Sequence, residues 1–223
     1  MKTSNILIII MLSLFLSAMV ASNLVLKKEF DKIDRKDPYS GYTKHSLQPF
    51  HYVKLQGVGF GVTEVSQGKD FEIKFVVDRK FLDWKVINDT LTVNYKKDFP
   101  EGGQSPQQIV HTLPSVYIFV PALKGLESNT INCKIKNMKQ ESLTVKQIGG
   151  AMVMLENQIS DLRADFVSGA IVTTYRENEF GNSKITVQDS STFQVDSNVF
   201  KSLDLQVGDS AHVKVPGSLL KKL

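Results

Sequence analysis

The second half of the chain repeats itself, and this repeat constrains the fold more than any other feature. In each of five segments the first residue is apolar, the eighth is small and the ninth is apolar. The segments start at Leu123, Leu143, Leu162, Ile185 and Leu203, so the period is roughly 20 residues. Self-similarity at such a period is typical of a solenoid, in which one unit cannot bury its apolar face alone and stacked units share a core.

Within a unit, short apolar runs alternate with corners. In the second unit the corner Gly149-Gly150 separates two runs, and we expect Leu143, Val145, Ala151, Val153 and Leu155 to face inward. Asn137, Asn157, Asn178 and Asn198 stand at similar places after the second run, and asparagine tolerates the left-handed backbone of tight turns. The pattern predicts an all-β fold, a single-stranded, right-handed parallel β-helix (solenoid) with one coil per repeat.

A β-sandwich is the alternative, because short strands every 8–12 residues also fit that fold. A sandwich does not require similar residues to recur at equivalent positions over five units, so we favour the β-helix. The C-terminal segment Pro216–Leu223 is expected to cover the open end of the core, since an uncovered last strand promotes aggregation.

The N-terminal segment is apolar enough to interact with a membrane. Residues Ile6–Leu26 contain no charged side chain, and 21 residues form about 30 Å of helix, close to the thickness of the hydrocarbon core of a bilayer. Two interpretations remain open: a secretory signal peptide cleaved after Ser22, or an uncleaved transmembrane anchor. We favour the anchor, because the apolar run continues to Leu26.

The orientation of this segment is ambiguous from its charges. A count of basic residues on each side places the C-terminal side in the cytoplasm, whereas a short basic N-terminus before an apolar run is typical of an export signal. We expect the domain outside the cytoplasm, in the cell envelope (periplasmic or surface), and secreted if the signal is cleaved.

We predict three regions: a signal anchor over residues 1–27, a polar tether over 28–49, and a β domain over 50–223. Strands are expected at His51–Leu55, Val62–Gln67, Phe71–Val77, Trp84–Ile87, Thr90–Tyr95 and Val116–Val120. Asn88-Asp89 predicts a tight hairpin, because both residues tolerate the positive φ of a type I′ turn. Lys96–Leu113 is expected to be a long exposed loop, and no segment after residue 30 has convincing helical spacing.

Composition excludes several classes of protein. The chain of 223 residues is 42% hydrophobic and 22% charged, which is ordinary for a folded domain. Its net charge of +4 comes from interspersed basic and acidic residues rather than from a basic stripe, so nucleic acid is not an expected partner. The single cysteine, Cys133, rules out an internal disulfide and occupies an apolar repeat position, where we expect a buried thiol.

The residues also resemble a known family. The segments Phe50–Gly68 and Asn88–Val93, with corners Gly149–Ala151, Ser168–Ala170 and Asp209–Ala211, are similar to the "putative auto-transporter adhesin, head GIN domain" family of bacterial envelope proteins. The resemblance covers residues 50–215. It implies an extracytoplasmic right-handed β-helix with an adhesin-like role, and it supplies no catalytic residue.

The sequence contains no recognisable catalytic, cofactor-binding or metal-binding motif. The four histidines (His45, His51, His111 and His212) lack metal-ligand spacing, and the glycines of Gly57–Gly61 are not followed by the helix that a phosphate-binding loop requires. Aspartates are numerous in the repeats, at Asp161, Asp165, Asp189, Asp196, Asp204 and Asp209. We interpret them as solvated surface residues.

Two functions in different classes therefore remain. The favoured one is a non-catalytic, membrane-anchored envelope protein that presents a flat β face to a glycan, a matrix component or another envelope protein. The alternative is a carbohydrate-active enzyme, a polysaccharide lyase or hydrolase. A cleft holding two carboxylates and a base within reach favours the enzyme, and a flat polar or aromatic face favours binding.

Overall fold

The computed structural model describes residues 3–31, 34, 36–58, 61–96 and 105–221 of the chain. The contacts between residues divide the chain into a first unit that ends at Tyr42 and a compact unit that begins at Thr43. The first unit contains helix α1 (Thr3–Phe30), whose described side chains are all exposed. This helix is long and apolar enough to cross a membrane, although a signal sequence meets the same criteria. The predicted boundaries at residues 27 and 49 stay predictions.

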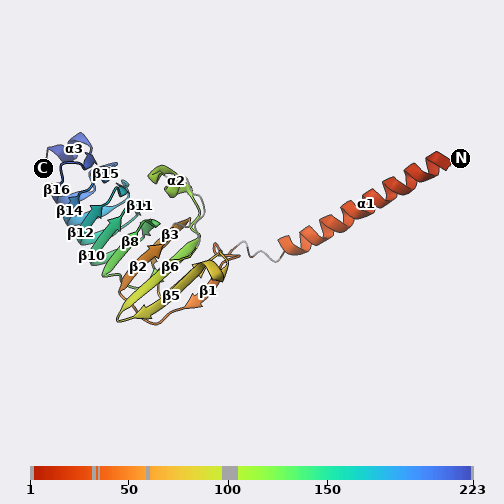
Figure 1. Ribbon diagram of the computed structural model, residues 1–223, viewed down its shortest axis with the longest axis horizontal. Coiled ribbons are helices and arrows are strands. Elements are labelled where there is room, and N and C mark those ends of the chain that lie inside the picture. The colour runs from red at the N-terminus through yellow and green to blue at the C-terminus, as the bar shows by residue number, and fades with distance from the viewer. Residues whose placement is uncertain (1–2, 32–33, 35, 59–60, 97–104, 222–223) are drawn as a thin grey trace. The chain divides into compact units, whose positions relative to one another are not determined.

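The compact unit is built mainly of strands (Figure 1). Its first half contains β1 (Thr43–Ser46), β2 (Tyr52–Gly57), β3 (Val62–Gln67), β4 (Glu72–Phe75), the 3₁₀ turn η1 (Arg79–Phe81), β5 (Leu82–Ile87), β6 (Thr90–Tyr95), α2 (Pro106–His111) and β7 (Val116–Val120). Its second half contains β8 (Gly125–Asn129), β9 (Asn132–Lys136), β10 (Lys139–Ile148), β11 (Ala151–Leu155), β12 (Gln158–Val167), β13 (Ile171–Thr174), β14 (Glu179–Val187), β15 (Thr192–Val195), β16 (Phe200–Val207), β17 (His212–Lys214) and α3 (Gly217–Leu220).

The strands form two large sheets that share one core. Sheet A has nine strands in the order β1-β4-β7-β3-β9-β11-β13-β15-β17, and sheet B has eight in the order β16-β14-β12-β10-β8-β2-β6-β5. The aromatic rings of Phe166 in β12 and Phe193 in β15 pack with centroids 5.4 Å apart, which joins the inner faces of the two sheets. From β8 onward the chain passes alternately between the sheets, and each pass adds one parallel strand to each of them.

The predicted single-stranded parallel β-helix is therefore wrong. Both sheets are mixed, because β1 with β4, β4 with β7 and β5 with β6 pair antiparallel. Each repeat contributes two strands, one to each sheet, whereas the predicted coil of a β-helix consists of three short strands. Like the β-sandwich that we considered as the alternative, the fold has two sheets around one core. Unlike that alternative, the strands of its second half pair in parallel with the strands of the next repeat, as the periodicity indicated.

Pairing registers show how the repeats are truly aligned. Gly125, Thr144, Arg163, Lys184 and Asp204 occupy one position on five neighbouring strands. The predicted start at Ile185 is thus displaced by two residues, because Leu162 pairs with Ser183. Ser183 is buried in a column of leucines. Because serine is polar, the sequence does not mark this position as part of the core.

The inward residues of sheet A are displaced by one residue from our prediction in β11. Met152 pairs with Val172, which in turn pairs with Phe193, and these side chains are buried in the main core. Val153 instead lies on the outer side of the sheet in a separate apolar cluster. A one-residue change in corner length reverses the facing of a whole strand, because side chains alternate between faces.

Asparagines at the second corner form a ladder. The backbone N–H of Met138 donates to Oδ1 of Asn157 (3.0 Å), and the Asn157 backbone N–H and Nδ2 both donate to Oδ1 of Asn178 (3.0 and 2.9 Å). Both asparagines are buried, and their Nδ2 groups also donate to backbone carbonyls. These side chains form hydrogen bonds with backbone N–H and C=O groups at the corners, where no neighbouring strand supplies a partner.

Of two other predictions at the strand ends, the hairpin is confirmed, and the covering of the core by Pro216–Leu223 is confirmed for Leu219 alone, because Leu220 is exposed and residues 222–223 lie outside the described residues. Asn88 and Asp89 have φ values of 48° and 64°, as the tight hairpin between β5 and β6 requires. Leu219, in α3, is buried against the core at the C-terminal end. The expected loop Lys96–Leu113 lies partly outside the described residues, and its described part contains helix α2, which the sequence analysis missed. Ser105 begins α2 with a capping box shared with Gln108.

We predict that Val172→Asp destabilises the compact unit by at least about 3 kcal/mol, because it places an unpaired charge between Met152 and Phe193. Ile171→Asp is the matched control, since its side chain is 41% exposed on the outer side of the same strand, and it should cost about 1 kcal/mol or less. Urea unfolding of both variants measures the difference. Equal stability of the two variants would show that Val172 does not face the core.

We also predict that Cys133 resists alkylation in the folded chain. Burial raises the pKa of its thiol to about 12, so at pH 8 the thiolate is roughly one part in ten thousand of the total. Iodoacetamide should label the native chain negligibly and the guanidinium-unfolded chain once, since the sequence has one cysteine. Similar labelling rates in the two states would contradict the buried position.

Candidate functional site

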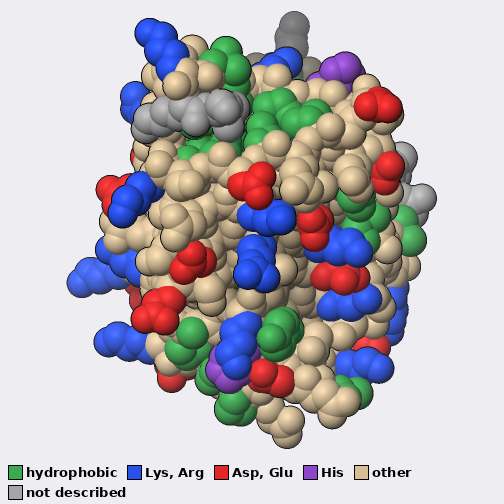
Figure 2. Space-filling model, turned by 90° about the vertical axis from the view of Figure 1, so that its left-hand side faces the viewer, with side chains coloured by type: hydrophobic (Ala, Val, Ile, Leu, Met, Phe, Trp, Pro, Cys, Tyr) green, Lys and Arg blue, Asp and Glu red, His purple; other side chains and the backbone are tan. Residues whose placement is uncertain are grey.

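The outer face of sheet B carries rows of polar side chains. Alternate residues of β10, β12, β14 and β16 point away from the core, and in-register parallel pairing places equivalent residues about 4.8 Å apart on neighbouring strands. One row contains Ser142, Asp161, Asn182 and Ser202; the next contains Thr144, Arg163, Lys184 and Asp204; the third contains Glu127, Lys146, Asp165, Thr186 and Gln206. Figure 2 shows basic and acidic side chains interleaved on one side of the molecule.

This face is hollowed. A depression of about 770 Å³ is lined by the first two rows over β10, β12, β14 and β16. Two further depressions, of about 370 and 340 Å³, continue it toward β8 and β2. Thr144 lines all three, so we treat them as one continuous depression and call it the sheet B groove.

An exposed aromatic ring stands at the β2 end of the groove. Tyr52 is 44% exposed and lines the depression together with Gly125, its partner on β8. A Cβ atom at position 125 would lie 2.8 Å from Cδ1 of Tyr52, which is closer than packed atoms approach. Glycine at this position therefore allows the tyrosine ring to lie against the sheet, with its other surface available to a ligand.

Charges of both signs line the groove. Lys184 and Asp204 form an ion pair with Nζ and Oδ2 3.8 Å apart, and Nδ2 of Asn182 donates to Oδ1 of Asp161 (3.2 Å). Outside the first depression, Nζ of Lys54 lies 2.9 Å from Oε1 of Glu127. The two basic and two acidic side chains of the 770 Å³ depression balance each other, so the groove offers many hydrogen-bond donors and acceptors without a large net field.

Arg163 differs from the other charged residues of the groove. Its neighbours in register are Thr144 on one side and Lys184 on the other, so two cations lie side by side on adjacent strands. Within the described part of the chain, no ion pair or side-chain hydrogen bond involves Arg163, whose side chain is exposed. Its guanidinium group therefore presents its donors to the groove.

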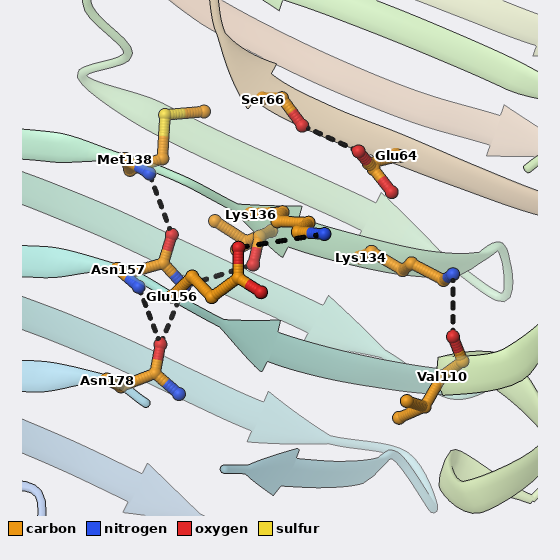
Figure 3. Close-up of polar contacts among 10 residues, drawn as sticks. Glu64, Ser66, Val110, Lys134, Lys136, Met138, Glu156, Asn157 and Asn178 are labelled. Atoms are coloured by element: carbon orange, nitrogen blue, oxygen red, sulfur yellow. Dashed lines mark hydrogen bonds and ion pairs between the residues drawn. The ribbon is translucent and has the colours of Figure 1, made fainter. Parts of the chain in front are cut away.

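The outer face of sheet A is covered where β9, β11 and β13 run, so it offers no comparable surface there. Helix α2 packs on it, with Ile109 buried against Ala151 and Val153. Nζ of Lys134, on β9, donates to the carbonyl of Val110 (3.1 Å; Figure 3) and to that of Thr112 (2.8 Å) at the end of α2. Burial lowers the pKa of this lysine, and the nearby carboxylate of Glu64 opposes the shift.

The structure divides the six repeat aspartates into two groups. Asp161, Asp165 and Asp204 lie on the outer face of sheet B, whereas Asp189, Asp196 and Asp209 lie outside the strands, at corners. The histidines are dispersed: His45 stacks on Phe75, and His51 lies 2.7 Å from Asp89. Among the described residues, no group of three or more His, Cys, Asp or Glu side chains is placed to hold a metal ion.

Sequence reasoning missed the residues that distinguish the groove, namely Tyr52, Gly125, Thr144, Arg163 and Lys184. Each of them points outward from a strand. The sequence shows that such a residue alternates with buried ones, but it does not show which part of the surface the residue occupies. Only the pairing register brings Arg163 beside Lys184 and Tyr52 beside Gly125. An accurate repeat alignment would have shown the first of these pairs.

The fold is similar to that of a solved bacterial protein. The structure of a "putative adhesin" from Parabacteroides distasonis ATCC 8503 superposes with a TM-score of 0.55 at 15% identity, covering 78% of this chain and 72% of that one. A "putative adhesin" from Bacteroides fragilis NCTC 9343 (TM-score 0.36, 12% identity, 78% and 95% covered) and a "putative cell adhesion protein" from Clostridium sporogenes ATCC 15579 (0.33, 9%, 78% and 97%) are more distant.

Compared with family models and with curated protein sequences, the chain matches none. Membership of the head GIN domain family stays a prediction from the sequence. At 15% identity, the first structural similarity shows a shared fold and leaves the function to be argued from the groove.

Proposed function

We propose that this chain is a non-catalytic, membrane-anchored protein of the bacterial cell envelope that binds glycans in the sheet B groove. The observation that carries the proposal is a depression lined by hydroxyl, amide and charged side chains that ends at the exposed ring of Tyr52. The name of the Parabacteroides distasonis protein that superposes with a TM-score of 0.55, a "putative adhesin", agrees with this role.

The chemistry of the groove suits a sugar better than an apolar ligand. A glycan presents hydroxyl groups that both donate and accept hydrogen bonds, and the first depression offers hydroxyls of Ser142, Thr144 and Ser202 beside amide and carboxylate groups. Sugar rings also have an apolar face that stacks on an aromatic ring, and Tyr52 supplies one. A ligand that lacked polar groups would leave the groove side chains without partners.

The length of the groove suits an oligosaccharide. Tyr52 and Arg163 lie at one position on strands three spacings apart, across β8 and β10, which is about 14 Å. A single sugar ring does not reach from one to the other. A chain of several sugars lying across the strands contacts both.

The separation of the carboxylates disfavours the hydrolase alternative. Asp161 and Asp204 lie two strands and two residues apart in the pairing grid, as do Asp165 and Asp204, so each pair is separated by roughly 12 Å. Glu127 and Asp165 lie nearer, two strands apart in one row and so about 9.6 Å, but Glu127 is held in an ion pair by Lys54. Glycoside hydrolases hold their two carboxyl groups about 5–9.5 Å apart. This spacing supports a binding function without turnover.

Helix α1 supports the envelope location. Its length and composition allow it to cross a bilayer, and we propose that it anchors the chain with the tether and compact unit outside the cytoplasm. If the segment is instead cleaved as a signal peptide, the compact unit is secreted.

We predict that Tyr52→Ala weakens glycan binding about 3- to 10-fold, because a stacked aromatic contact contributes about 0.5–1.5 kcal/mol. Tyr52→Phe keeps the ring and should bind as the native chain does. The measurement is a glycan array probed with the full chain in a detergent without sugar headgroups, followed by calorimetry on the best ligand. Equal binding by the alanine and phenylalanine variants, or turnover of a bound polysaccharide, would contradict the proposal.

We also predict that protease added to intact spheroplasts degrades the compact unit. The unit is exposed to the protease if α1 holds it outside the cytoplasmic membrane. A cytoplasmic protein in the same cells serves as the control for lysis. Protection of the compact unit until the membrane is disrupted would place it in the cytoplasm and exclude the envelope role.

A further inference from the structure

We infer that the sheet B groove recognises a glycan bearing one anionic substituent, a carboxylate or a sulfate, which binds at Arg163 and Lys184. This inference rests on the proposed glycan-binding function and specifies its ligand.

Two cations lie side by side in the sheet B groove. Arg163 and Lys184 are partners in register on β12 and β14, and like charges directly opposite each other destabilise a sheet. Asp204, on β16, offsets the charge of Lys184 from the far side, at 3.8 Å. Thr144, the neighbour of Arg163 on the other side, carries no charge. Asp161 and Asp165 lie two residues away from Arg163 on β12, but no ion pair among the described residues joins them to it, so an anion bound at the guanidinium group offsets the charge at closer range.

The guanidinium group of Arg163 has a geometry that suits an anion. Its donors form a planar fork that matches the two oxygens of a carboxylate or a sulfate, and such bidentate contacts are among the strongest hydrogen bonds in proteins. Arg163 lines both the 770 and the 370 Å³ depressions, so its donors face the part of the groove that the ligand would fill. Lys184 lines the same two depressions and supplies a second positive charge.

The carboxylates around the two cations limit the number of anionic groups that the groove accepts. Asp161 and Asp165 flank Arg163 on its own strand, and Asp204 lies beyond Lys184, so three carboxylates surround the pair of cations. A densely charged polyanion would bring its other charges against these carboxylates. The groove therefore favours a ligand with a single anionic group near Arg163 and uncharged sugars toward Tyr52, about 14 Å away.

The test uses the full chain in a detergent without sugar headgroups and a matched panel of probes. Lactose, N-acetyllactosamine and cellotetraose are each presented uncharged, with one terminal uronic or sialic acid residue, and with one sulfate; a heparin tetrasaccharide is the polyanionic probe. We expect a singly charged member to bind about tenfold more tightly than its neutral counterpart, and Arg163→Gln to abolish this difference. Comparing the carboxylated with the sulfated member identifies the anion.

Two variants separate a specific contact from a loss of charge or of folding. Arg163→Lys keeps the charge without the planar fork and should lose most of the preference. Lys85→Gln removes an exposed cation of β5 that does not line the groove, and it should leave the preference unchanged. Thermal unfolding of each variant checks that the groove is intact.

The outcomes distinguish this inference from the function on which it rests. If neutral and charged probes bind equally tightly and their binding depends on Tyr52, the anionic specificity is overturned and the glycan-binding function stands. If the heparin tetrasaccharide binds more tightly than every singly charged probe, the limit to one anionic group is overturned. A panel in which no member binds would overturn both proposals.

Discussion

The structure depends on the register in which successive repeats pair. Once Thr144, Arg163 and Lys184 are aligned on neighbouring strands, the alternation of side chains decides which residues enter the core and which line the groove. Sheet A has a register of its own, because Met152 pairs with Val172, a step of 20 residues, whereas Thr144 pairs with Arg163 in sheet B, a step of 19. A slip by a single residue in one strand would expose its core residues and bury its groove residues, so core packing and groove chemistry cannot vary independently.

The sequence contained enough information for the repeat and for most of the strands. Val62–Gln67, Thr90–Tyr95 and Val116–Val120 were predicted with the bounds that the structure has, because apolar alternation and turn residues mark them clearly. The number of strands per repeat was not predictable in the same way. A corner and a short irregular connection have similar compositions, and only hydrogen-bond partners distinguish them.

Corner length explains the errors in facing. Ala151 resembles Ala170, since each follows a small corner, yet Ala151 pairs with Ile171 because the corner before β13 is longer than the corner before β11. Val153 therefore lies under α2. The apolar residues of β11 alternate between the main core on one face of the strand and the cluster beneath α2 on the other. The groove was hidden for the same reason: the step from Arg163 to Lys184 is longer than the step from Thr144 to Arg163, and a uniform period does not align them.

The way in which the groove is assembled has a consequence for how such proteins change over time. Each repeat supplies one strip of the binding face, roughly 4.8 Å wide, together with the piece of core beneath it. Duplicating a unit ahead of the final α3 lid would widen the face by one strip while the existing contacts, including the tyrosine at the far margin, kept their places. The reach of the protein along a ligand is therefore a quantity that gene duplication can adjust in fixed increments.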